Sequence, residues 1–351
     1  MIPISTLLDS IEEAYTNQLP FVAFQEPNTS LVTAYFQNND QLHFVKDYSE
    51  QGFVFAPFEV GKPSVLIPLG NELQAKHSFE IKNVSSGKAY QEDPKAKTNH
   101  VEFVEKAKSF LEKKSVSKVV IARKKDIVCN SFDMRSAFEK LLGSYPSATN
   151  YVWFHPKVGL WMGATPEILL KVENQSFTTM ALAGTQVYEG VADVKWKPKE
   201  LEEQQMVTDY VLDKLKKHTV SLQHSEVYTV KAGNLLHLRT DIQGEVSSKD
   251  GVMELLNIVH PTPAVCGFPT EIAKEFIVEN EDFNRSYYTG FLGALNVNSK
   301  TVLYVNLRCM ERLSSNIIRL YIGGGITAKS VALQEWEETV SKCKTMEQVL
   351  F

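Results

Sequence analysis

Strand-like segments separated by very short polar turns constrain the fold of this chain most. The segments 301–313 and 316–322 both have the apolar pattern of strands, and only Ser314 and Ser315 stand between them. A parallel pair would need a connection of about a dozen residues or more, whereas an antiparallel pair needs only a tight turn. These neighbours therefore predict an antiparallel hairpin rather than a β-α-β unit.

Elsewhere the chain mixes strand and helix periodicities. Short apolar runs separated by turn residues predict strands in the first 80 or so residues. Further strands are predicted over 115–128, 153–163, 167–173 and 316–323, and helices over 100–114, 199–218 and 331–350. We therefore expect an α+β protein with a large, mostly antiparallel β-sheet system and flanking helices.

A polar stretch indicates how the chain is organised. Ser85 to Asn99 is the best candidate for a linker or surface loop. It separates a β-rich N-terminal part, residues 1–95, from the region 96–351, which carries the candidate site residues. A chain of 351 residues is long enough for a sizeable core, and we expect both parts to form one compact structural domain.

Charge and composition exclude several classes of function. The formal net charge of −5 argues against a nucleic-acid partner. No apolar run of about 18 residues could span a membrane, and the N-terminus lacks the features of a secretory signal. Cys129, Cys266, Cys309 and Cys343 form no C-x-x-C pair, which favours reduced thiols. We expect a cytoplasmic monomer.

Two predicted helices each carry acidic residues one turn apart. Glu200 and Glu203 fall inside an apolar arc, where carboxylates are costly unless something neutralises them. Glu335 and Glu338 share a stripe with Lys342 on the last predicted helix. Taken singly, the first pair also suits a helix N-terminus, and the second a surface ion pair. Two such helices together favour a Mg²⁺ site, because this ion prefers carboxylate oxygens.

Two basic residues stand among apolar positions of predicted strands. Alternation places Lys118 beside Val116 and Val120, and Arg308 beside Tyr304. Burial would favour the neutral amine of Lys118, which can serve as a base, and Arg308 would require a carboxylate or phosphate partner. A sheet edge or a solvated face explains both residues equally well.

Glycine-rich segments give weaker signals. Gly323, Gly324 and Gly325 would let the backbone approach an anion closely, or they would form a tight turn. Their spacing does not match a dinucleotide-binding pattern. The small residues around Gly163 and Gly184 suit either turns or loops that face a substrate.

Nine segments, in this order along the chain, together resemble the chorismate-utilising enzyme family. They are SKVVIARKKDI, GATPEILLKV, ALAGTQ, KELEEQQMV, LLHLRTDIQG, HPTPAVCGFP, RSYYTGFLGAL, VNLRCMERL and IGGGITAKSVALQEWEETVSKCKTM. The resemblance covers roughly Asn99 to Phe351. It implies the chorismate-binding fold of anthranilate synthase component I, with chorismate as the substrate.

The resemblance also implies that water is the nucleophile. Water-using members of the family hold a lysine base at the position of Lys118, and aminodeoxychorismate-forming members place a nucleophilic lysine where this chain has Ala183. The run HPTPAVCGFP is similar to the isochorismate-forming branch. The implied activity is that of an isomerase, which converts chorismate to isochorismate with Mg²⁺ as cofactor. Water attacks C2 and the C4 hydroxyl leaves.

Each candidate residue receives a role from the same resemblance. Lys118 is implied as the general base and Glu167 as the general acid. The implied Mg²⁺ site consists of the direct ligands Glu203 and Glu338, with Glu200 and Glu335 holding its waters or completing the site. The implied substrate contacts are Ala183, Gly184, His237, Arg308, Gly323, Gly325 and Lys342.

Two alternatives remain open. A salicylate synthase forms the same isochorismate and then eliminates pyruvate, and it would differ only in apolar packing near Val265 and Tyr288. A non-catalytic subunit would keep the fold without the chemistry, and the intact Lys118, Glu167 and Arg308 speak against it. Isochorismate serves menaquinone or catecholate siderophore biosynthesis, and the residues favour neither pathway.

Overall fold

The computed structural model describes the chain except for residues 80–91, 115, 192, 233–234, 247–250 and 351. Two large sheets dominate the described part, sheet A with nine strands and sheet B with ten. Every strand pair recorded between described residues is antiparallel. The predicted α+β class with a mostly antiparallel sheet system is therefore confirmed.

The elements have the following bounds. Sheet A has the order β15 (Gly267–Phe268), β7 (Lys118–Val128), β19 (Ile317–Ile326), β18 (Cys309–Arg312), β9 (Gly159–Thr165), β8 (Thr149–His155), β1 (Phe21–Gln25), β2 (Leu31–Phe36) and β6 (Asn71–Lys76). Sheet B has the order β12 (Thr219–His224), β14 (Leu235–Val246), β11 (Ser176–Val187), β10 (Ile168–Glu173), β17 (Lys300–Val305), β16 (Phe291–Val297), β4 (Gly52–Ala56), β5 (Val65–Pro68) and β3 (His43–Phe44), with β13 (Tyr228–Ala232) paired to β14. The helices are α1 (Ile4–Thr16), α2 (Pro94–Lys114), α3 (Met134–Ser144), α4 (Pro198–Lys216), α5 (Gly251–Val259), α6 (Thr270–Asn280) and α7 (Ala332–Leu350).

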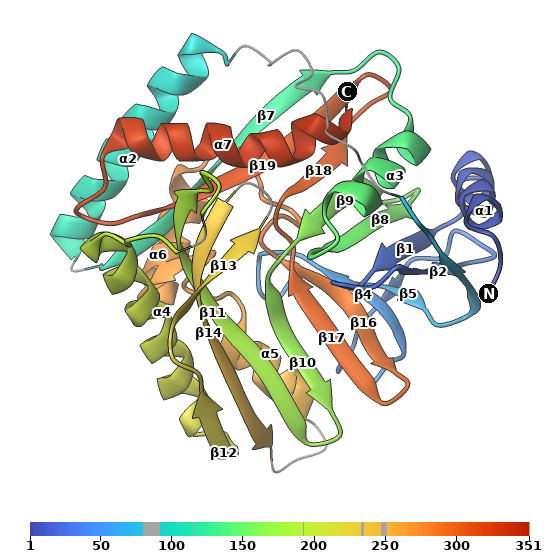
Figure 1. Cartoon of the computed structure of the whole chain (residues 1–351), viewed down its shortest axis with the longest axis horizontal. Helices are drawn as coiled ribbons and strands as arrows, with labels where there is room; N and C mark the ends of the chain where they lie inside the picture. Colours follow the sequence, from blue (N-terminus) through green and yellow to red (C-terminus); the bar gives the residue numbers. More distant parts are fainter. Residues whose placement is uncertain (80–91, 115, 192, 233–234, 247–250, 351) are drawn as a thin grey trace.

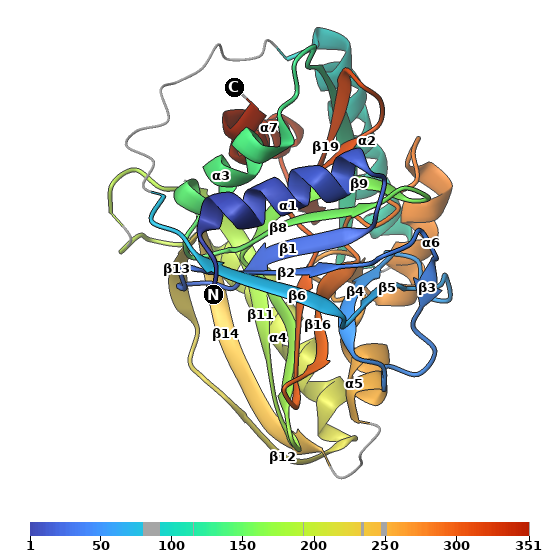
Figure 2. The ribbon, with the colours of Figure 1, turned by 90° about the vertical axis from the view of Figure 1, so that its right-hand side faces the viewer.

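The two sheets form the middle of the molecule, and helices cover their outer faces (Figures 1 and 2). An aromatic cluster that includes Phe55 of sheet B and Trp153 and Trp161 of sheet A fills the space between the sheets. Helices α1, α3 and α7 bury their apolar faces on sheet A, and α4 and α5 bury theirs on sheet B. Helices α2 and α6 pack beside β7. Burial of these apolar faces is the main driving force for this arrangement.

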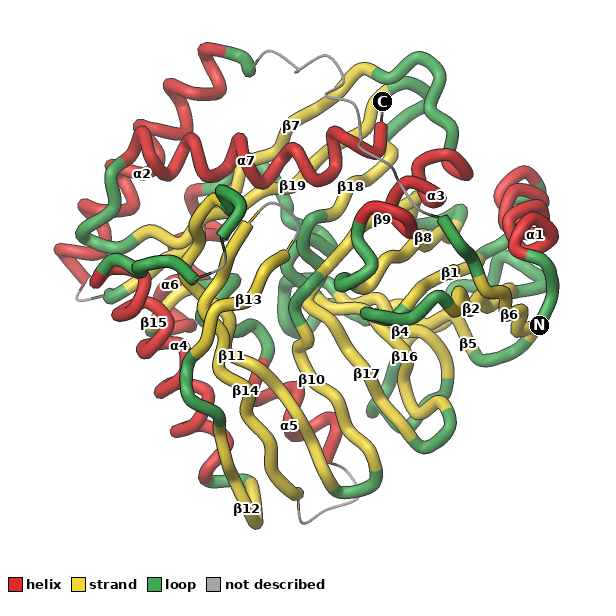
Figure 3. Tube along the Cα trace, viewed as in Figure 1, coloured by secondary structure: helices red, strands yellow, loops and turns green. Residues whose placement is uncertain are grey.

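The N-terminal strands belong to both sheets. Strand β1 pairs with β8 in sheet A, and β4 pairs with β16 in sheet B. The strands of the first 76 residues therefore lie within the same two sheets as the strands of the rest of the chain (Figure 3).

The helical predictions and several strand predictions are confirmed. Helices α2, α4 and α7 cover the three predicted helical segments, and β7, β10 and β19 cover three of the predicted strands. The predicted hairpin is the pair β18–β19, in which Met310 lies opposite Leu320. Residues 85–91 of the polar stretch lie outside the described residues. Residues 94–99, predicted as part of a linker or loop, are instead the first turns of α2.

Two segments predicted as single strands are each two strands. Segment 153–163 is the hairpin of β8 and β9, because residues 156–158 form the turn between them. Segment 301–313 divides into β17 of sheet B and β18 of sheet A. The chain crosses between the sheets at residues 306–308, where Arg308 adopts the left-handed φ of 47°. Alternation predicted that Arg308 shares a strand face with Tyr304. This prediction is wrong, because Arg308 lies between the two strands.

The structure also corrects one smaller prediction, on Val116, and excludes one of the two alternatives for the triple glycine. Val116 precedes β7 and packs with Val119 and Ile121, which lie on the face opposite Lys118. Gly323 to Gly325 form no tight turn, because they continue β19 and pair with β7.

Two further findings concern the cysteines and the search for membrane-spanning helices. The four cysteines are free and buried. No helix in the described part of the chain is long and apolar enough to cross a membrane.

Candidate active site

One cavity gathers almost all of the predicted site residues. Together with its mouth it has a volume of about 920 Å³. The predicted residues that line it are Lys118, Glu167, Ala183, Gly184, Glu200, Glu203, His237, Arg308, Gly323, Gly325, Glu338 and Lys342. Glu335 is the exception, because it lies behind Lys199, which does line the cavity. Val265 and Tyr288, predicted to pack around the substrate ring, also line it.

Strands β7 and β19 form one wall of the cavity. Lys118 begins β7 and is only 1% exposed, and its Nζ lies 2.8 Å from Oε1 of Glu203. A Cβ atom at Gly325 would lie 2.8 Å from Cε of Lys118 and 3.0 Å from Oε1 of Glu203. A side chain at Gly325 would therefore disrupt this pair, so the glycine provides space for the lysine as well as an accessible backbone.

Glu167 and Arg308 lie where the chain crosses between the two sheets. Glu167 follows β9 and precedes β10, and Arg308 stands between β17 and β18. Hydrogen bonds join the two crossings, because the hydroxyl of Thr165 donates to the carbonyl of Val305 at 2.6 Å. The amide of Val305 donates to the carbonyl of Glu167, and that of Ala164 to the carbonyl of Arg308. The acid and the cation are therefore positioned together.

The environment of Glu167 favours its protonated form. The side chain is buried, and this burial raises the pKa of Glu167 to about 7 although Lys118, Arg308 and Lys342 act in the opposite direction. A carboxyl group with such a pKa holds a proton near neutral pH and can donate it, as a general acid must.

His237 orients the guanidinium of Arg308. Its Nδ1 lies 2.9 Å from the carbonyl oxygen of Gly184, and its Nε2 lies 3.1 Å from Nη2 of Arg308. A carbonyl only accepts and a guanidinium only donates, so the neutral ring carries its proton on Nδ1. Burial and the charge of Arg308 lower the pKa of His237 to about 3, which keeps the ring neutral.

Gly184 brings strand β11 close to helix α4. Its φ of +69° is left-handed, and the pairing of β11 with β14 shifts register between Ala183 and Gln186. A Cβ atom at Gly184 would lie 3.1 Å from Cβ of Glu200. The glycine therefore lets the strand approach the N-terminal end of α4, which carries Glu200 and Glu203.

The four predicted metal ligands come from the first turns of α4 and α7. Three of them are held by lysines: Glu203 by Lys118 at 2.8 Å, Glu335 by Lys199 at 2.6 Å and Glu338 by Lys342 at 2.7 Å. The fourth, Glu200, has a buried Oε2 without a hydrogen-bond partner among the described residues. Burying four carboxylates in one place requires such compensation by positive charge.

The two acids of α7 affect each other. Burial and the charge of Glu338 raise the pKa of Glu335. Burial also acts to raise the pKa of Glu338, but Lys342, Lys199 and Arg308 together hold it below the usual value. Glu338 therefore keeps its negative charge, as a direct metal ligand must.

The donor set fits a hard divalent cation. Carboxylate oxygens are the ligands that Mg²⁺ prefers, and Oε2 of Glu200, which has no hydrogen-bond partner among the described residues, could serve as such a ligand. The four acids do not form a closed set of ligands here. In the described part of the chain, three or more possible ligand atoms of His, Cys, Asp or Glu lie within 4.8 Å of one another only at Glu92, Cys343 and Glu347. A cation would have to compete with the lysines for the acids of α4 and α7.

Lys199 is a site residue that the sequence analysis missed. It lines the cavity and pairs with Glu335. Burial alone would lower the pKa of Lys199, but the negative charge of Glu335 outweighs it, and the pKa is raised. The signal in the sequence was its place four residues before Glu203, within the same cluster of acids.

The sequence of this chain matches a known protein family. The family described as "Chorismate binding enzyme" matches residues 68–351. The chain belongs to this chorismate-binding enzyme family. Isochorismate synthase EntC of Escherichia coli is 30% identical over 259 residues, which cover 71% of this chain and 66% of EntC. The matched stretch thus spans just under two thirds of that relative's length.

Solved structures support the same fold. A structure described as the putative 2,3-dihydroxybenzoate-specific isochorismate synthase DhbC of Bacillus anthracis has a TM-score of 0.80 at 22% identity, covering 98% of this chain and 99% of that one. Anthranilate synthase component I of Streptococcus pneumoniae has a TM-score of 0.68 at 18% identity, covering 93% of this chain and 89% of that one. The predicted resemblance to the anthranilate synthase component I fold is confirmed.

Proposed function

We propose that this chorismate-binding enzyme is an isochorismate synthase. In the proposed reaction one water adds to C2 of chorismate, the ring double bonds shift, and the C4 hydroxyl leaves as water. Atoms balance, because one water enters and one departs. The relative EntC carries the name of this activity. The observation that carries the proposal is a buried lysine, Lys118, and a buried protonatable acid, Glu167, that line one cavity from different elements.

Glu167 would donate the proton that the leaving C4 hydroxyl requires. Its pKa of about 7 supports this role, because the group is protonated to a large extent near neutral pH. Its position at the crossing between the sheets is held by backbone hydrogen bonds rather than by a flexible loop. The proton would therefore be offered from a fixed position.

Lys118 would take the proton from the attacking water. The Nζ of Lys118 is engaged by Glu203, so we infer that it takes this proton once Glu203 has turned to another partner. A metal ion bound by Glu203 would be such a partner. The ion pair between a base and a metal ligand thus supports a base that becomes active only in the metal-loaded site.

The two carboxylates of chorismate require cationic partners. Arg308, fixed by His237, offers a guanidinium to one of them, and the backbone at Gly323 and Gly325 is close by on β19. Lys342 contributes a second cation, and its Nζ already donates to the carbonyl of Gly323 at 2.9 Å. Ala183 and Gly184 would contact the substrate from the opposite strand, β11.

Mg²⁺ is the proposed cofactor. Glu203 and Glu338 would hold it directly, and Glu200 and Glu335 would hold its waters or complete the site. When bound, the ion would orient the ring carboxylate and balance its charge. The four acids on two helices support this assignment, as does Oε2 of Glu200, which is buried and accepts no hydrogen bond from the described residues.

Incubating the pure protein with chorismate and Mg²⁺, followed by separation of the products, tests the proposal. We expect isochorismate, at a rate that Lys118→Ala lowers by about 10²-fold or more. Lys124→Ala on the same strand is the control, because its ammonium contacts the exposed Asp282 outside the cavity. Salicylate and pyruvate would identify a salicylate synthase instead. No turnover would indicate a non-catalytic subunit, and an aminated product with ammonium salts would contradict water as the nucleophile.

A further inference from the structure

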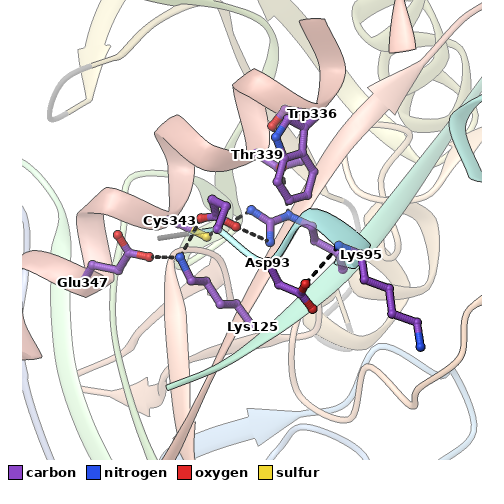
Figure 4. Close-up of polar contacts among 9 residues, drawn as sticks. Asp93, Lys95, Lys125, Trp336, Thr339, Cys343 and Glu347 are labelled. Carbon is purple, nitrogen blue, oxygen red and sulfur yellow. Dashed lines mark hydrogen bonds and ion pairs between the residues drawn. The ribbon is translucent and has the colours of Figure 1, made fainter. Parts of the chain in front are cut away.

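A partly buried cluster of charged side chains lies between β7 and α7 (Figure 4). Arg123 and Lys125 point from β7 towards helix α7, whereas Lys118, on the other face, lines the cavity. Glu92, just before α2, contacts both cations, Arg123 at 3.4 Å and Lys125 at 2.5 Å. We propose that within this cluster Arg123 is a positioning residue, which sets the rotation of α7 and so aims its acids at the metal site.

Arg123 holds one face of α7 through several contacts. Its Nε donates to the hydroxyl of Thr339 at 2.8 Å, and its guanidinium carbon lies 4.3 Å from the ring centre of Trp336. Its Nη2 lies 3.6 Å from Sγ of Cys343. Arg123 is 8% exposed and Thr339 is fully buried, so these contacts are protected from water. The hydroxyl of Thr339 donates a hydrogen bond to the carbonyl of Trp336 at 2.7 Å. The same hydroxyl oxygen accepts the hydrogen bond from Arg123.

The spacing along α7 links these contacts to the cavity. Each of the residues held by Arg123 follows directly after a site residue: Trp336 after Glu335, Thr339 after Glu338, and Cys343 after Lys342. Successive residues of an α-helix are separated by about 100° around its axis. Fixing one stripe therefore fixes the direction of the other. A loss of the Arg123 contacts would let α7 turn or shift, and the carboxylate of Glu338 would move with it.

The same cluster is a poor metal site, although Glu92, Cys343 and Glu347 lie close enough together to hold an ion. Lys125 already places its ammonium between Glu92 and Glu347, at 2.5 and 2.6 Å. Burial raises the pKa of Cys343 to about 12, so the thiol keeps its proton and is a weak ligand. The cations therefore take the place that a metal would need, which supports a structural role for the cluster.

Lys125 provides a matched control for Arg123. Both cations project from the same face of β7 and both bind Glu92. The ion pair that Lys125 makes with α7 is to Glu347, which lies two turns and more beyond Glu338. If α7 needs only to be held on the sheet, the two residues are equivalent. If its rotation near Glu338 matters, they are not.

This inference rests on the proposed function, and its test uses the full chain. The variants are Arg123→Met, Thr339→Val, Thr339→Ser and Lys125→Met. Titration with Mn²⁺, followed by the loss of its free electron-spin signal, measures metal binding without turnover. Activity against Mg²⁺ concentration and the Tm are measured in parallel.

Arg123→Met and Thr339→Val should weaken metal binding by about 10-fold or more, as expected for residues that orient metal ligands. Thr339→Ser, which keeps the hydroxyl, should bind like the wild type. Lys125→Met should lower the Tm and leave metal binding unchanged. Thr339→Val keeps the test valid if Arg123→Met does not fold, because it nearly preserves the side-chain volume.

Equal metal binding by wild type, Arg123→Met and Thr339→Val would overturn the inference, as would an equal loss in Lys125→Met. A wild type that neither binds the metal nor converts chorismate would instead contradict the proposed function. The two failures are therefore distinguishable.

Discussion

Burial of Glu167 provides a proton donor and also lowers the stability of the fold. The unfolded chain releases the proton of this carboxyl near pH 4.5, and the folded chain releases it near pH 7. The folded state therefore binds more protons between these values, and stability must fall as the pH rises through this window. Above it the full cost of a buried charged carboxylate remains. The acid that would serve catalysis thus weakens the fold at the pH where it would work.

Replacing Glu167 by glutamine should separate the two effects. Glu167→Gln removes the proton donor and should lower turnover by about 10²-fold or more. It should also stabilise the fold at pH 8 by on the order of 3 kcal/mol, and hardly at all at pH 4. Urea unfolding at both pH values measures this, and wild-type turnover should decline above about pH 7. The exposed Glu202→Gln is the control. A gain in stability that is the same at both pH values would contradict the assigned pKa.

The acids of α4 and α7 give a second prediction at this scale. Glu203→Ala and Glu338→Ala should abolish turnover and metal binding while the protein stays folded, because each removes a proposed ligand. EDTA should silence the wild type and Mg²⁺ should restore it. Glu202→Ala is a close control, since Glu202 is next to Glu203 but pairs with Lys329 at the surface. Circular dichroism checks the fold. Full activity of either ligand variant, or full activity in EDTA, would remove Mg²⁺ from the proposed mechanism.

At the residue scale, the sequence identified the site residues better than it identified their ion-pair partners. The resemblance pointed to Lys118, Arg308 and the four acids, and all but Glu335 line the cavity. It did not reveal that Lys199 holds Glu335, or that Lys118 holds Glu203. Such pairs join positions that are far apart in the chain. Local spacing carries no information about them.

At the scale of elements, helices were the most predictable. The apolar stripes of α2, α4 and α7 repeat over many residues, so the pattern identifies each helix and the face that it buries. The strands were harder, because alternation continues across a point where the chain changes sheet. Residues 301–313 look like one strand, although Arg308 bends the backbone through a left-handed conformation. Only tertiary contacts determine where such a strand divides.

The two crossings between the sheets yield a prediction of their own. Thr165→Val removes the hydrogen bond to Val305 that joins the crossings carrying Glu167 and Arg308. It should cost about 1 kcal/mol of stability, because the buried carbonyl of Val305 loses one of two hydrogen bonds and keeps the one from the amide of Leu307. It should also raise the KM for chorismate or lower kcat, since the acid and the guanidinium are no longer held together.

Thr179→Val is the matched control for this change. Its hydroxyl also donates to a buried strand carbonyl at 2.6 Å, that of Leu169, but this bond joins β11 to β10 within sheet B and does not link the two crossings. Both variants should lose similar stability, as chemical denaturation will show. Only Thr165→Val should change the steady-state parameters. If the two variants have the same kinetics, the hydrogen bond between the crossings supports the fold alone.

At the scale of the whole molecule, the N-terminal part is the least predictable from sequence. Its strands were recognisable, but their partners were not, because β1 and β4 pair with β8 and β16, which come much later in the chain. The resemblance begins only near Asn99, so it gave little help before that point, and the family model matches from residue 68 onwards. We propose that residues 1–95 and 96–351 form a single folding unit. The proposal rests on strands of the first part lying within both sheets.

A chain reduced to residues 96–351 provides the test. It would lack β1, β2 and β6 from sheet A and β3, β4 and β5 from sheet B, so β8 and β16 would become exposed edges that pair with other chains. It would also lack Phe24, Phe53 and Phe55 from the cluster between the sheets, and Trp153 would lose its packing against Phe55. We expect this fragment to aggregate when expressed alone, and co-expression with residues 1–95 to restore soluble, active protein. Size-exclusion chromatography and the chorismate assay measure both outcomes. A soluble fragment 96–351 with wild-type turnover would show that the first 95 residues are a separate unit, and the strand pairs that link them to both sheets would then contribute little to folding.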